Sequence, residues 1–286
     1  MTSIETLSPL TVQRAIQFGQ EQFGLPRLDA QMLVLHACEL LMHDRAWLIA
    51  HSDEVLNFKT QSRYLDFLQR RAGLEPLAYI TGVKEFFGLQ LHIDKRVLDP
   101  RPETETLVEW ALSCVADTSR PRIADLGAGS GAIALALKHS LPSAQVTAVD
   151  ASADAIDLAI ANGKRLGLEI VTHVGSWCEP LAGQSLDLIV SNPPYVADGD
   201  THLAQLPHEP LSALVAGKDG LDDIRNIVAQ SADHLKPGAW LLLEHGYDQA
   251  QPVQDLLANQ GFVSVQSRQD LAGILRCTGG QWPRVK

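Results

Sequence analysis

Apolar positions in the first 75 residues repeat with the period of an α-helix. Three stretches space them so that they share one helix face. The residues that share a face are Val12, Ile16, Gly19 and Phe23, then Leu33, Ala37, Leu40 and Leu41, and finally Tyr64, Phe67 and Leu68 together with the charged Arg71. Gly24-Leu25-Pro26 and the polar residues 51–54 separate the stretches. The pattern predicts a small helical bundle over residues 1–75.

Over residues 76–100 the pattern changes, and part of this segment alternates between apolar and polar residues. Leu89, Leu91 and Ile93 alternate with polar residues, and Gly82 and Gly88 interrupt the run. A period of two indicates strands, because successive side chains of a strand point to opposite faces. We expect short strands or a hairpin here, which connects two domains.

From about residue 120 onward, short apolar runs alternate with helical stretches. The expected strands cover 123–126, 146–149, 186–191 and 239–244, and the expected helices include 132–138 and 153–166. This alternation predicts an open, mostly parallel α/β sheet with helices on both faces. Runs at 262–266 and 274–277 have only a short connection, which suits an antiparallel pair at the sheet edge. We place this domain at residues 101–286, beginning with a helix after Arg101-Pro102.

The composition is that of an ordinary globular chain of 286 residues, with 45% hydrophobic and 20% charged residues. The formal net charge is −11, which argues against a general grip on nucleic-acid backbone. The four cysteines stand far apart and the histidines lack ligand spacing, so we expect no metal site and a reducing compartment. No secretory signal and no apolar run of membrane-spanning length occurs. We expect a cytoplasmic monomer without a membrane or direct nucleic-acid partner.

The first motif with chemical meaning is the glycine-rich run from Asp125 to Gly131, Asp-Leu-Gly-Ala-Gly-Ser-Gly. It follows a strand and opens a helix, where glycines let the backbone approach a ligand and helix N–H groups point at it. Asp150 ends the next strand, 19 residues past Gly131, where an acid typically accepts ribose hydroxyls. The spacing is G-x-G-x-G, which differs from the dinucleotide motif. It favours a nucleoside cofactor over a tight turn without a ligand.

The second motif is Asn192-Pro193-Pro194-Tyr195, directly after the strand expected at 186–191. Neither proline has an N–H, so the loop offers two acceptors, the Asn192 side-chain oxygen and the Pro193 carbonyl. Two adjacent acceptors match the two donors of a planar NH₂ group, and Tyr195 supplies a flat face for stacking. The alternative is a rigid loop in which the prolines merely end a strand. Asparagine before them and tyrosine after them favour a functional loop.

Together the motifs resemble class I S-adenosylmethionine-dependent methyltransferases that modify planar nitrogens, through DLGAGSGAIALAL, VTAVD and NPPY. The segments PLAYITGVKEFFGL, DPRPETETLVE, HEPLSALVAGKDGLDDIR and LLLEHG are similar to the release-factor glutamine methyltransferase family. Members of that family methylate the side-chain amide (N5) of the glutamine in the Gly-Gly-Gln loop of peptide chain release factors. The resemblance spans residues 76–275. It implies a Rossmann-like class I methyltransferase sheet, with a small N-terminal helical domain that recognises the substrate protein.

The resemblance also implies which residues hold S-adenosylmethionine. The expected cofactor residues are Gly127, Ala128, Gly129, Ser130 and Gly131 beside the methionine part, Asp150 at the ribose, Trp177 near the adenine, and Asn192. Trp177 could instead be a core residue. Ser176 stands before it where the family usually has an acid.

For the substrate side, the resemblance implies Asn192, Pro193, Pro194 and Tyr195 around the amide, with Arg101, Pro102 and Glu105 lining the crevice. Arg101 and Glu105 could instead form a structural ion pair. Asp99 stands nearby, where the family pattern has an aliphatic residue.

These residues predict direct transfer of a methyl group to an amide nitrogen, with Asn192, Pro193 and Tyr195 in the catalytic roles. Two acceptors would orient the NH₂ group and raise its electron density, and no strong general base is required. The alternatives are amino-methylation of adenine N6 in nucleic acid or of a ribosomal-protein glutamine. A non-catalytic cofactor-binding module is disfavoured by the intact acceptor loop. The chain's own Gly279-Gly280-Gln281 repeats the substrate tripeptide, which we interpret as chance.

Overall fold

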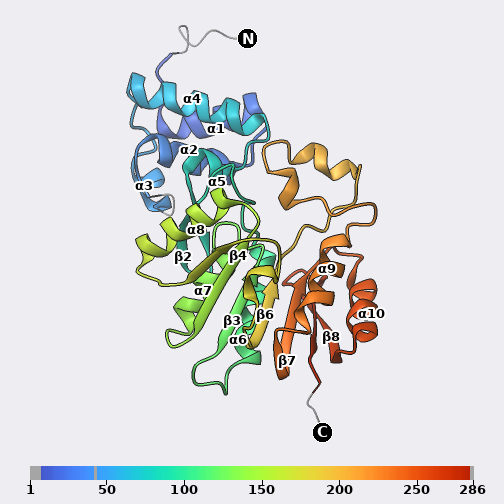
Figure 1. Ribbon diagram of the computed structural model, residues 1–286. Helices are drawn as coiled ribbons and strands as arrows, with labels where there is room; N and C mark the ends of the chain where they lie inside the picture. Colours follow the sequence, from blue (N-terminus) through green and yellow to red (C-terminus); the bar gives the residue numbers. More distant parts are fainter. Residues whose placement is uncertain (1–7, 42–43, 284–286) are drawn as a thin grey trace. The chain divides into compact units, whose positions relative to one another are not determined.

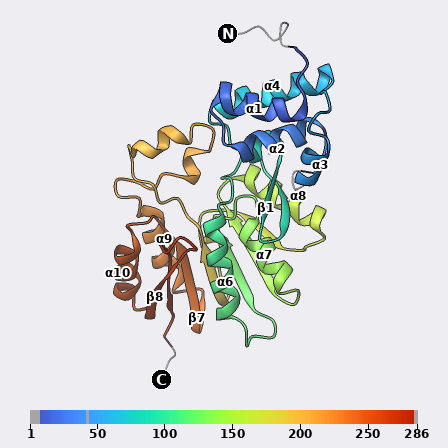
Figure 2. The ribbon, with the colours of Figure 1, turned by 180° about the vertical axis from the view of Figure 1, so that it is seen from behind.

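The computed structural model describes residues 8–41 and 44–283 (Figures 1 and 2). The chain forms two compact units. One comprises the residues up to Gly82 together with His202–His208, and the other comprises Val83–Thr201 and the residues from Glu209 onward. Each unit contains its own cluster of buried hydrophobic side chains.

The first unit is a bundle of helices, as the apolar spacing predicted. Its helices are α1 (Val12–Phe23), α2 (Arg27–Ala37), α3 (Arg45–Ala50), α4 (Phe58–Ala72) and α5 (Leu77–Thr81). Thr11 begins α1 by accepting a hydrogen bond from a backbone N–H, and Gly24 ends it in the left-handed conformation. In the core, the buried Tyr64 hydroxyl donates to the Ala15 carbonyl at 3.0 Å. The later segment joins this unit where His208 Nε2 lies 2.9 Å from the Gly73 carbonyl oxygen.

The prediction that Leu40 and Leu41 continue the second helix is wrong. The α2 helix ends at Ala37, and Leu41 is 69% exposed. Glu39 adopts a left-handed φ of 62°, and the Leu40 N–H bonds to the carbonyl of Leu35, five residues back. This is the closing pattern that glycine usually supplies at a helix end. Because glutamate stands there instead, the sequence carried no stop signal.

The hairpin expected within residues 76–100 is confirmed, and a short helix precedes it. The strands β1 (Val83–Phe86) and β2 (Leu89–His92) pair antiparallel. The two residues between them, Phe87 and Gly88, have positive φ values of 50° and 78°, as a tight hairpin turn of two residues demands. The α5 helix before it was not predicted.

The second unit contains the predicted sheet, in the order β5-β4-β3-β6-β7-β9-β8. Its strands are β3 (Arg122–Leu126), β4 (Gln145–Asp150), β5 (Val171–Val174), β6 (Leu186–Ser191), β7 (Leu235–Glu244), β8 (Val263–Gln269) and β9 (Leu275–Gln281). The first five in spatial order run parallel, and β9 is antiparallel to both β7 and β8, which confirms the antiparallel edge pair. The β5 strand was missed, because it lies at the other edge and exposes Val171 and Val174.

Helices pack along this sheet as the alternation predicted (Figures 1 and 2). They are α6 (Glu105–Cys114), α7 (Ala132–Ser140), α8 (Ala153–Leu166), α9 (Asp222–Ser231) and α10 (Ala250–Gln260), with 3-10 turns at Pro102–Thr104, Glu179–Leu181, Thr201–Gln205 and Leu211–Ala213. Alternate strand residues such as Ala124, Ile189 and Leu241 pack with α9 and α10 in one buried cluster. Between β5 and β6 the described chain has a 3-10 turn in place of a full helix.

The chain's own Gly-Gly-Gln tripeptide lies inside β9 and is structural. A Cβ on Gly279 would come within 2.4 Å of the Leu242 side chain and 2.8 Å of the Leu241 carbonyl oxygen. The Gln281 amide donates to the Gly238 carbonyl at 2.7 Å. The glycines therefore serve the close approach of neighbouring chain segments, and the glutamine amide is engaged.

Gly279→Ala should lower the free energy of unfolding by about 1–3 kcal/mol, because a methyl group has no space beside Leu242. Urea unfolding followed by circular dichroism measures this change. Leu271→Ala is the control, since Leu271 is fully exposed in the turn before β9. Equal stabilities of the two variants would contradict the steric argument.

Asp125, which lies in β3 just before the glycine loop, is fully buried and closes the turn into α7. Its Oδ2 accepts the Ala134 backbone N–H at 3.0 Å, while Oδ1 has no hydrogen-bond partner among the described residues. Burial raises the pKa of this carboxyl to about 7; the Ala134 hydrogen bond opposes the shift and the nearby Asp150 adds to it. The folded chain therefore holds a proton here that an unfolded aspartate releases near pH 4.

Asp125→Asn should make stability less dependent on pH. The wild-type free energy of unfolding falls as pH rises from 5 to 8, since the folded state binds more protons than the unfolded state there. The variant keeps an oxygen that can accept from the Ala134 N–H, but it has no carboxyl that titrates. The free energy of unfolding of the variant minus that of wild type should therefore increase by at least about 1 kcal/mol between pH 5 and pH 8. Urea unfolding at both pH values tests it, with the exposed Asp233→Asn as the matched control. Parallel pH profiles of wild type and Asp125→Asn would contradict the assignment.

Candidate active site

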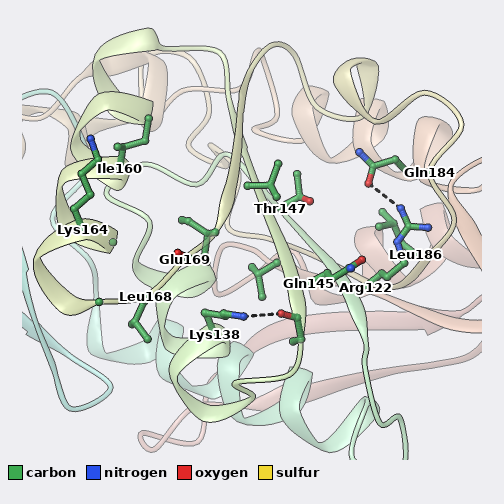
Figure 3. A pocket seen from close by; sticks show the side chains of 16 residues that line it. Arg122, Lys138, Gln145, Thr147, Ile160, Lys164, Leu168, Glu169, Gln184 and Leu186 are labelled. Carbon is green, nitrogen blue, oxygen red and sulfur yellow. Dashed lines mark hydrogen bonds between the residues drawn. The ribbon is translucent and has the colours of Figure 1, made fainter.

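Two cavities of comparable size lie in the second unit, at opposite ends of the sheet. The larger, of about 920 Å³, is lined by the first residues of four parallel strands, Arg122, Gln145, Val171 and Leu186 (Figure 3). Two of its cations are engaged: Lys138 donates to the Ala144 carbonyl at 2.9 Å, and Arg122 donates to Gln184 at 3.4 Å. Open α/β sheets bind ligands beyond the carboxyl ends of their strands, so the other cavity is the candidate site.

The candidate cavity has a volume of about 640 Å³, within the usual range for a small-molecule site. It brings together the residues that follow four parallel strands. They are Gly127, Ala128, Gly129 and Ser130 after β3, Asp150 at the end of β4, Ser176 and Trp177 after β5, and Asn192 and Pro194 after β6. Pro100 and Thr104 add to its wall from the segment before α6, and Pro210 and Ser212 add to it from the segment after the Asn192-Pro193-Pro194-Tyr195 loop. The two sequence motifs thus share one cavity.

The glycine loop is fixed by backbone hydrogen bonds and by Asp150. Gly127 and Gly129 have positive φ values of 72° and 54°, a conformation that glycine adopts without strain. The Gly129 N–H donates to Asp150 Oδ2 at 2.8 Å, and the Ser152 N–H donates to its Oδ1 at 2.8 Å. A carboxylate has further lone pairs, so Asp150 can still accept from a bound hydroxyl. Gly131 is not part of the cavity wall; a Cβ there would lie 3.1 Å from Ala159, so it serves the packing of α7 against α8.

Asn162 positions the loop, and the sequence analysis missed it. Its fully buried side chain on α8 donates to the Ser130 carbonyl at 3.0 Å. The same amide exchanges two hydrogen bonds with the His92 backbone at 2.7 and 3.0 Å, and so ties the hairpin to the loop. The available signal was a polar residue on the apolar face of an amphipathic helix.

Trp177 belongs to both the cavity wall and the core. It lines the cavity and also packs on the buried cluster beneath α9 and α10. The Trp177 ring lies close to the glycine loop, since a Cβ added to Gly127 would come within 3.4 Å of it. The Trp177 backbone has a φ of 46°, which is unusual for a bulky residue. Ser176 beside it is exposed and also lines the cavity.

The Asn192 side chain presents an unpaired oxygen. Its Nδ2 donates to Thr104 Oγ1 at 3.3 Å, while its Oδ1 is buried without a hydrogen-bond partner among the described residues. The following residues are held firmly, because Gln249 donates to the Tyr195 carbonyl at 3.0 Å and the Tyr195 N–H bonds to Leu214. Burial raises the pKa of the Tyr195 phenol above its usual value. Pro193 and Tyr195 belong to this loop but do not line the cavity itself.

Neither Arg101 nor Glu105 lines the cavity, and they do not pair with each other. Arg101 instead bonds Glu209 at 2.5 Å and lies 3.7 Å from Asp99. Glu105 accepts the Phe87 backbone N–H at 2.9 Å and so supports the hairpin turn. Pro102 is exposed at the start of a 3-10 turn and is likewise absent from the wall.

Asp99, where the sequence resemblance implied an aliphatic residue, is a buried member of this charged group. Its carboxylate also lies 3.1 Å from Lys84 on the hairpin. Its backbone N–H donates to Glu209 at 3.2 Å. A buried carboxylate is tolerated where cations and hydrogen bonds offset its desolvation, which explains how an acid fits at this position.

The described residues contain no group of three or more His, Cys, Asp or Glu side chains placed to hold a metal ion. Within the same ranges, no helix is long and apolar enough to cross a membrane. The wall of the candidate cavity offers backbone donors, the Asp150 carboxylate, the aromatic face of Trp177 and the Asn192 amide oxygen as an acceptor.

Comparison with known proteins agrees with this chemistry. Residues 106–209 match the Methyltransferase small domain, and residues 12–82 match the PrmC N-terminal domain. The T. thermophilus 16S rRNA N2 G1207 methyltransferase (RsmC), solved with AdoMet and guanosine, has a TM-score of 0.53 and 20% identity. That alignment covers 70% of this chain and 49% of the other, and it shows the class I methyltransferase fold.

Relatives in sequence cover almost the whole chain. A release factor glutamine methyltransferase from Xylella fastidiosa is 46% identical over 262 residues, which are 91% of this chain and 94% of the relative. One from Vibrio cholerae is 42% identical over 282 residues, 96% and 97% of the two chains. The chain thus belongs to the family of release factor glutamine methyltransferases.

Proposed function

We propose that this enzyme transfers a methyl group from S-adenosylmethionine to the side-chain amide nitrogen (N5) of the glutamine in the Gly-Gly-Gln motif of peptide chain release factors. The family membership supports the substrate. One structural observation carries the chemistry: Asn192 Oδ1 is buried and unpaired beside the glycine loop. A buried acceptor without a donor costs about 1–3 kcal/mol, which a substrate N–H would relieve.

The candidate cavity fits S-adenosylmethionine by its donors and shape. Glycines at positive φ leave room for the methionine part along Gly127–Ser130, Asp150 faces the space where a ribose would lie, and Trp177 offers a face for adenine. Ser176 beside Trp177 can still accept from or donate to an adenine edge through its hydroxyl. When bound, the cofactor supplies an electrophilic methyl group on a sulfonium.

The chain's own residues act by orienting the acceptor nitrogen. An amide nitrogen is a weak nucleophile because its lone pair is delocalised into the carbonyl. Asn192 Oδ1 and the Pro193 carbonyl accept its two N–H bonds, which fixes the amide plane and increases electron density on nitrogen. Tyr195 supports the flat side of the amide. Positioning of this kind contributes up to roughly 7–11 kcal/mol in favourable systems. The nitrogen would gain the methyl group as the bond between that methyl carbon and the sulfonium sulfur breaks, which leaves a neutral thioether, and the nitrogen would then lose a proton to solvent.

The proposal also assigns a role to each domain, a cellular compartment and a partner. The N-terminal helical domain (residues 1–75) recognises the release factor, and residues 76–100 connect this domain to the next. Residues 101–286 form the domain that catalyses methyl transfer. We place the enzyme in the cytoplasm as a monomer, with a protein substrate and no direct contact to nucleic acid. The net charge of −11 favours this substrate over adenine N6.

Mass spectrometry of a purified release factor, incubated with this protein and S-adenosylmethionine, tests the substrate. We expect one added methyl group, located by fragmentation on the glutamine of Gly-Gly-Gln. A release factor whose glutamine is replaced by alanine is the control. Added methyl groups in DNA or in a ribosomal protein, with none in the release factor, would overturn the proposed substrate. The proposal that the Asn192-Pro193-Pro194-Tyr195 loop binds a planar NH₂ group would then still hold.

Asn192→Ala should reduce turnover by at least about a hundredfold, since it removes one of the two acceptors that orient the amide. The affinity for cofactor, measured by isothermal titration calorimetry, should change by less than about tenfold, because the glycine loop and Asp150 remain. Near-normal turnover of Asn192→Ala would show that the loop does not orient the substrate as proposed.

A further inference from the structure

A buried carboxyl lies two hydrogen bonds away from the Asn192 amide. Glu244 is the last residue of β7 and is 1% exposed. The hydroxyl of Thr104, which is itself 3% exposed, is a hydrogen-bonding neighbour of this carboxyl and lowers its pKa. The Thr104 oxygen in turn accepts from Asn192 Nδ2 at 3.3 Å. The mechanism described above makes no use of this carboxyl.

The direction of these hydrogen bonds decides which end of Asn192 faces the substrate. A side-chain amide has nearly the same shape after a flip, but one end accepts and the other donates. A threonine hydroxyl carries a single proton, and an ionised carboxylate can only accept. While Thr104 gives its proton to Glu244, it can only accept from Asn192. The Asn192 NH₂ group must then turn to Thr104, which leaves the oxygen unpaired beside the cavity.

We propose that Glu244, acting through Thr104, is a positioning residue that keeps the oxygen of Asn192, and not its NH₂ group, directed at the substrate amide. This inference rests on the proposed function, because it concerns the acceptor that binds the substrate NH₂. It adds a residue outside the cavity to the machinery of the Asn192-Pro193-Pro194-Tyr195 loop.

The surroundings of Glu244 make this arrangement sensitive to pH. Its second oxygen, Oε2, has no hydrogen-bond partner among the described residues. Burial raises the pKa of Glu244 to about 7, the Thr104 hydrogen bond and the Arg276 and Arg101 charges oppose the rise, and Glu103 adds to it. The other titratable groups that interact with this carboxyl are Tyr195 and Cys277, whose pKa values are themselves raised mainly by burial.

Protonation of Glu244 reverses the hydrogen-bond direction. A protonated carboxyl can donate to Thr104, and the Thr104 proton is then free to donate to Asn192. That favours the flipped amide, in which an NH₂ group meets the NH₂ group of the substrate. Methyl transfer should therefore fall as pH drops from 8 to 6, with an apparent pKa of about 7.

The test is the pH profile of kcat, measured from pH 5.5 to 9 with a purified release factor and the full-length enzyme. Glu244→Gln should abolish the loss of rate between pH 8 and 6 and lower kcat at pH 8 by about tenfold, because its amide can either accept from or donate to Thr104. Thr104→Val should also lose at least about tenfold at pH 8. Thr104→Ser, which keeps the hydroxyl, should stay within about threefold of wild type. A Thr104→Val enzyme with wild-type kcat, or a Glu244→Gln enzyme with an unchanged acid limb, would overturn the proposal.

A second measurement does not depend on catalysis or on variants that must fold. The side-chain ¹⁵N–H₂ resonances of Asn192 in the wild-type protein should shift with a midpoint near pH 7, as the amide changes partners. Resonances that stay constant from pH 5.5 to 9 would refute the coupling to Glu244. If the release factor is not methylated at any pH, the proposed function is wrong. The titration of the Asn192 resonances still tests the coupling of Glu244 to Asn192 through Thr104 in that case.

Discussion

The parallel register at the centre of the sheet is the constraint on which the site depends. Leu126 of β3 pairs with Val149 of β4 on one side and with Ser191 of β6 on the other. These three paired residues lie side by side across the sheet, and each is followed directly by a residue of the candidate site: Gly127, Asp150 or Asn192. The Ser191 hydroxyl stabilises this alignment of β3 and β6 by donating a hydrogen bond to the Leu126 carbonyl at 2.7 Å. A slip of one residue would turn the buried side chains to the opposite face, so the packed core fixes the geometry of the site.

Buried polar side chains then hold the loops that the strands release. Asn162 bonds the glycine loop and the hairpin, and Gln249 bonds the carbonyls of Tyr195 and Asp219. Such groups are stable in the interior because their hydrogen bonds are made within the chain. Asn192 Oδ1 contrasts with these groups, since it is buried without a hydrogen-bond partner among the described residues, as are one carboxylate oxygen of Asp125 and one of Glu244. The surrounding bonds keep this acceptor in place, and under the proposed function its preorganisation favours the binding of an NH₂ group.

A charged group joins the segment before α6 to the segment after the Asn192-Pro193-Pro194-Tyr195 loop. Glu209 bonds both the Arg101 guanidinium and the Asp99 backbone. These two segments supply Pro100, Thr104, Pro210 and Ser212 to the cavity wall. Arg101 and Asp99 therefore shape the site from behind its surface. Asp99 adds a contact to Lys84 on the hairpin and is not itself part of the cavity wall.

The sequence by itself determined the α/β alternation, the antiparallel edge, both chemical motifs and the family, because periodicity, glycines and prolines act over a few residues. It did not predict β5, whose exposed edge lacks an apolar pattern, or the end of α2, where Glu39 replaces the usual glycine. Only the tertiary structure decided that Arg101 pairs with Glu209 and not with Glu105, that Gly131 serves packing, and that Asn162 and Glu244 stand behind the site. Those contacts join residues that lie far apart in the chain, and their partners are fixed by strand register and helix packing, which local spacing does not encode.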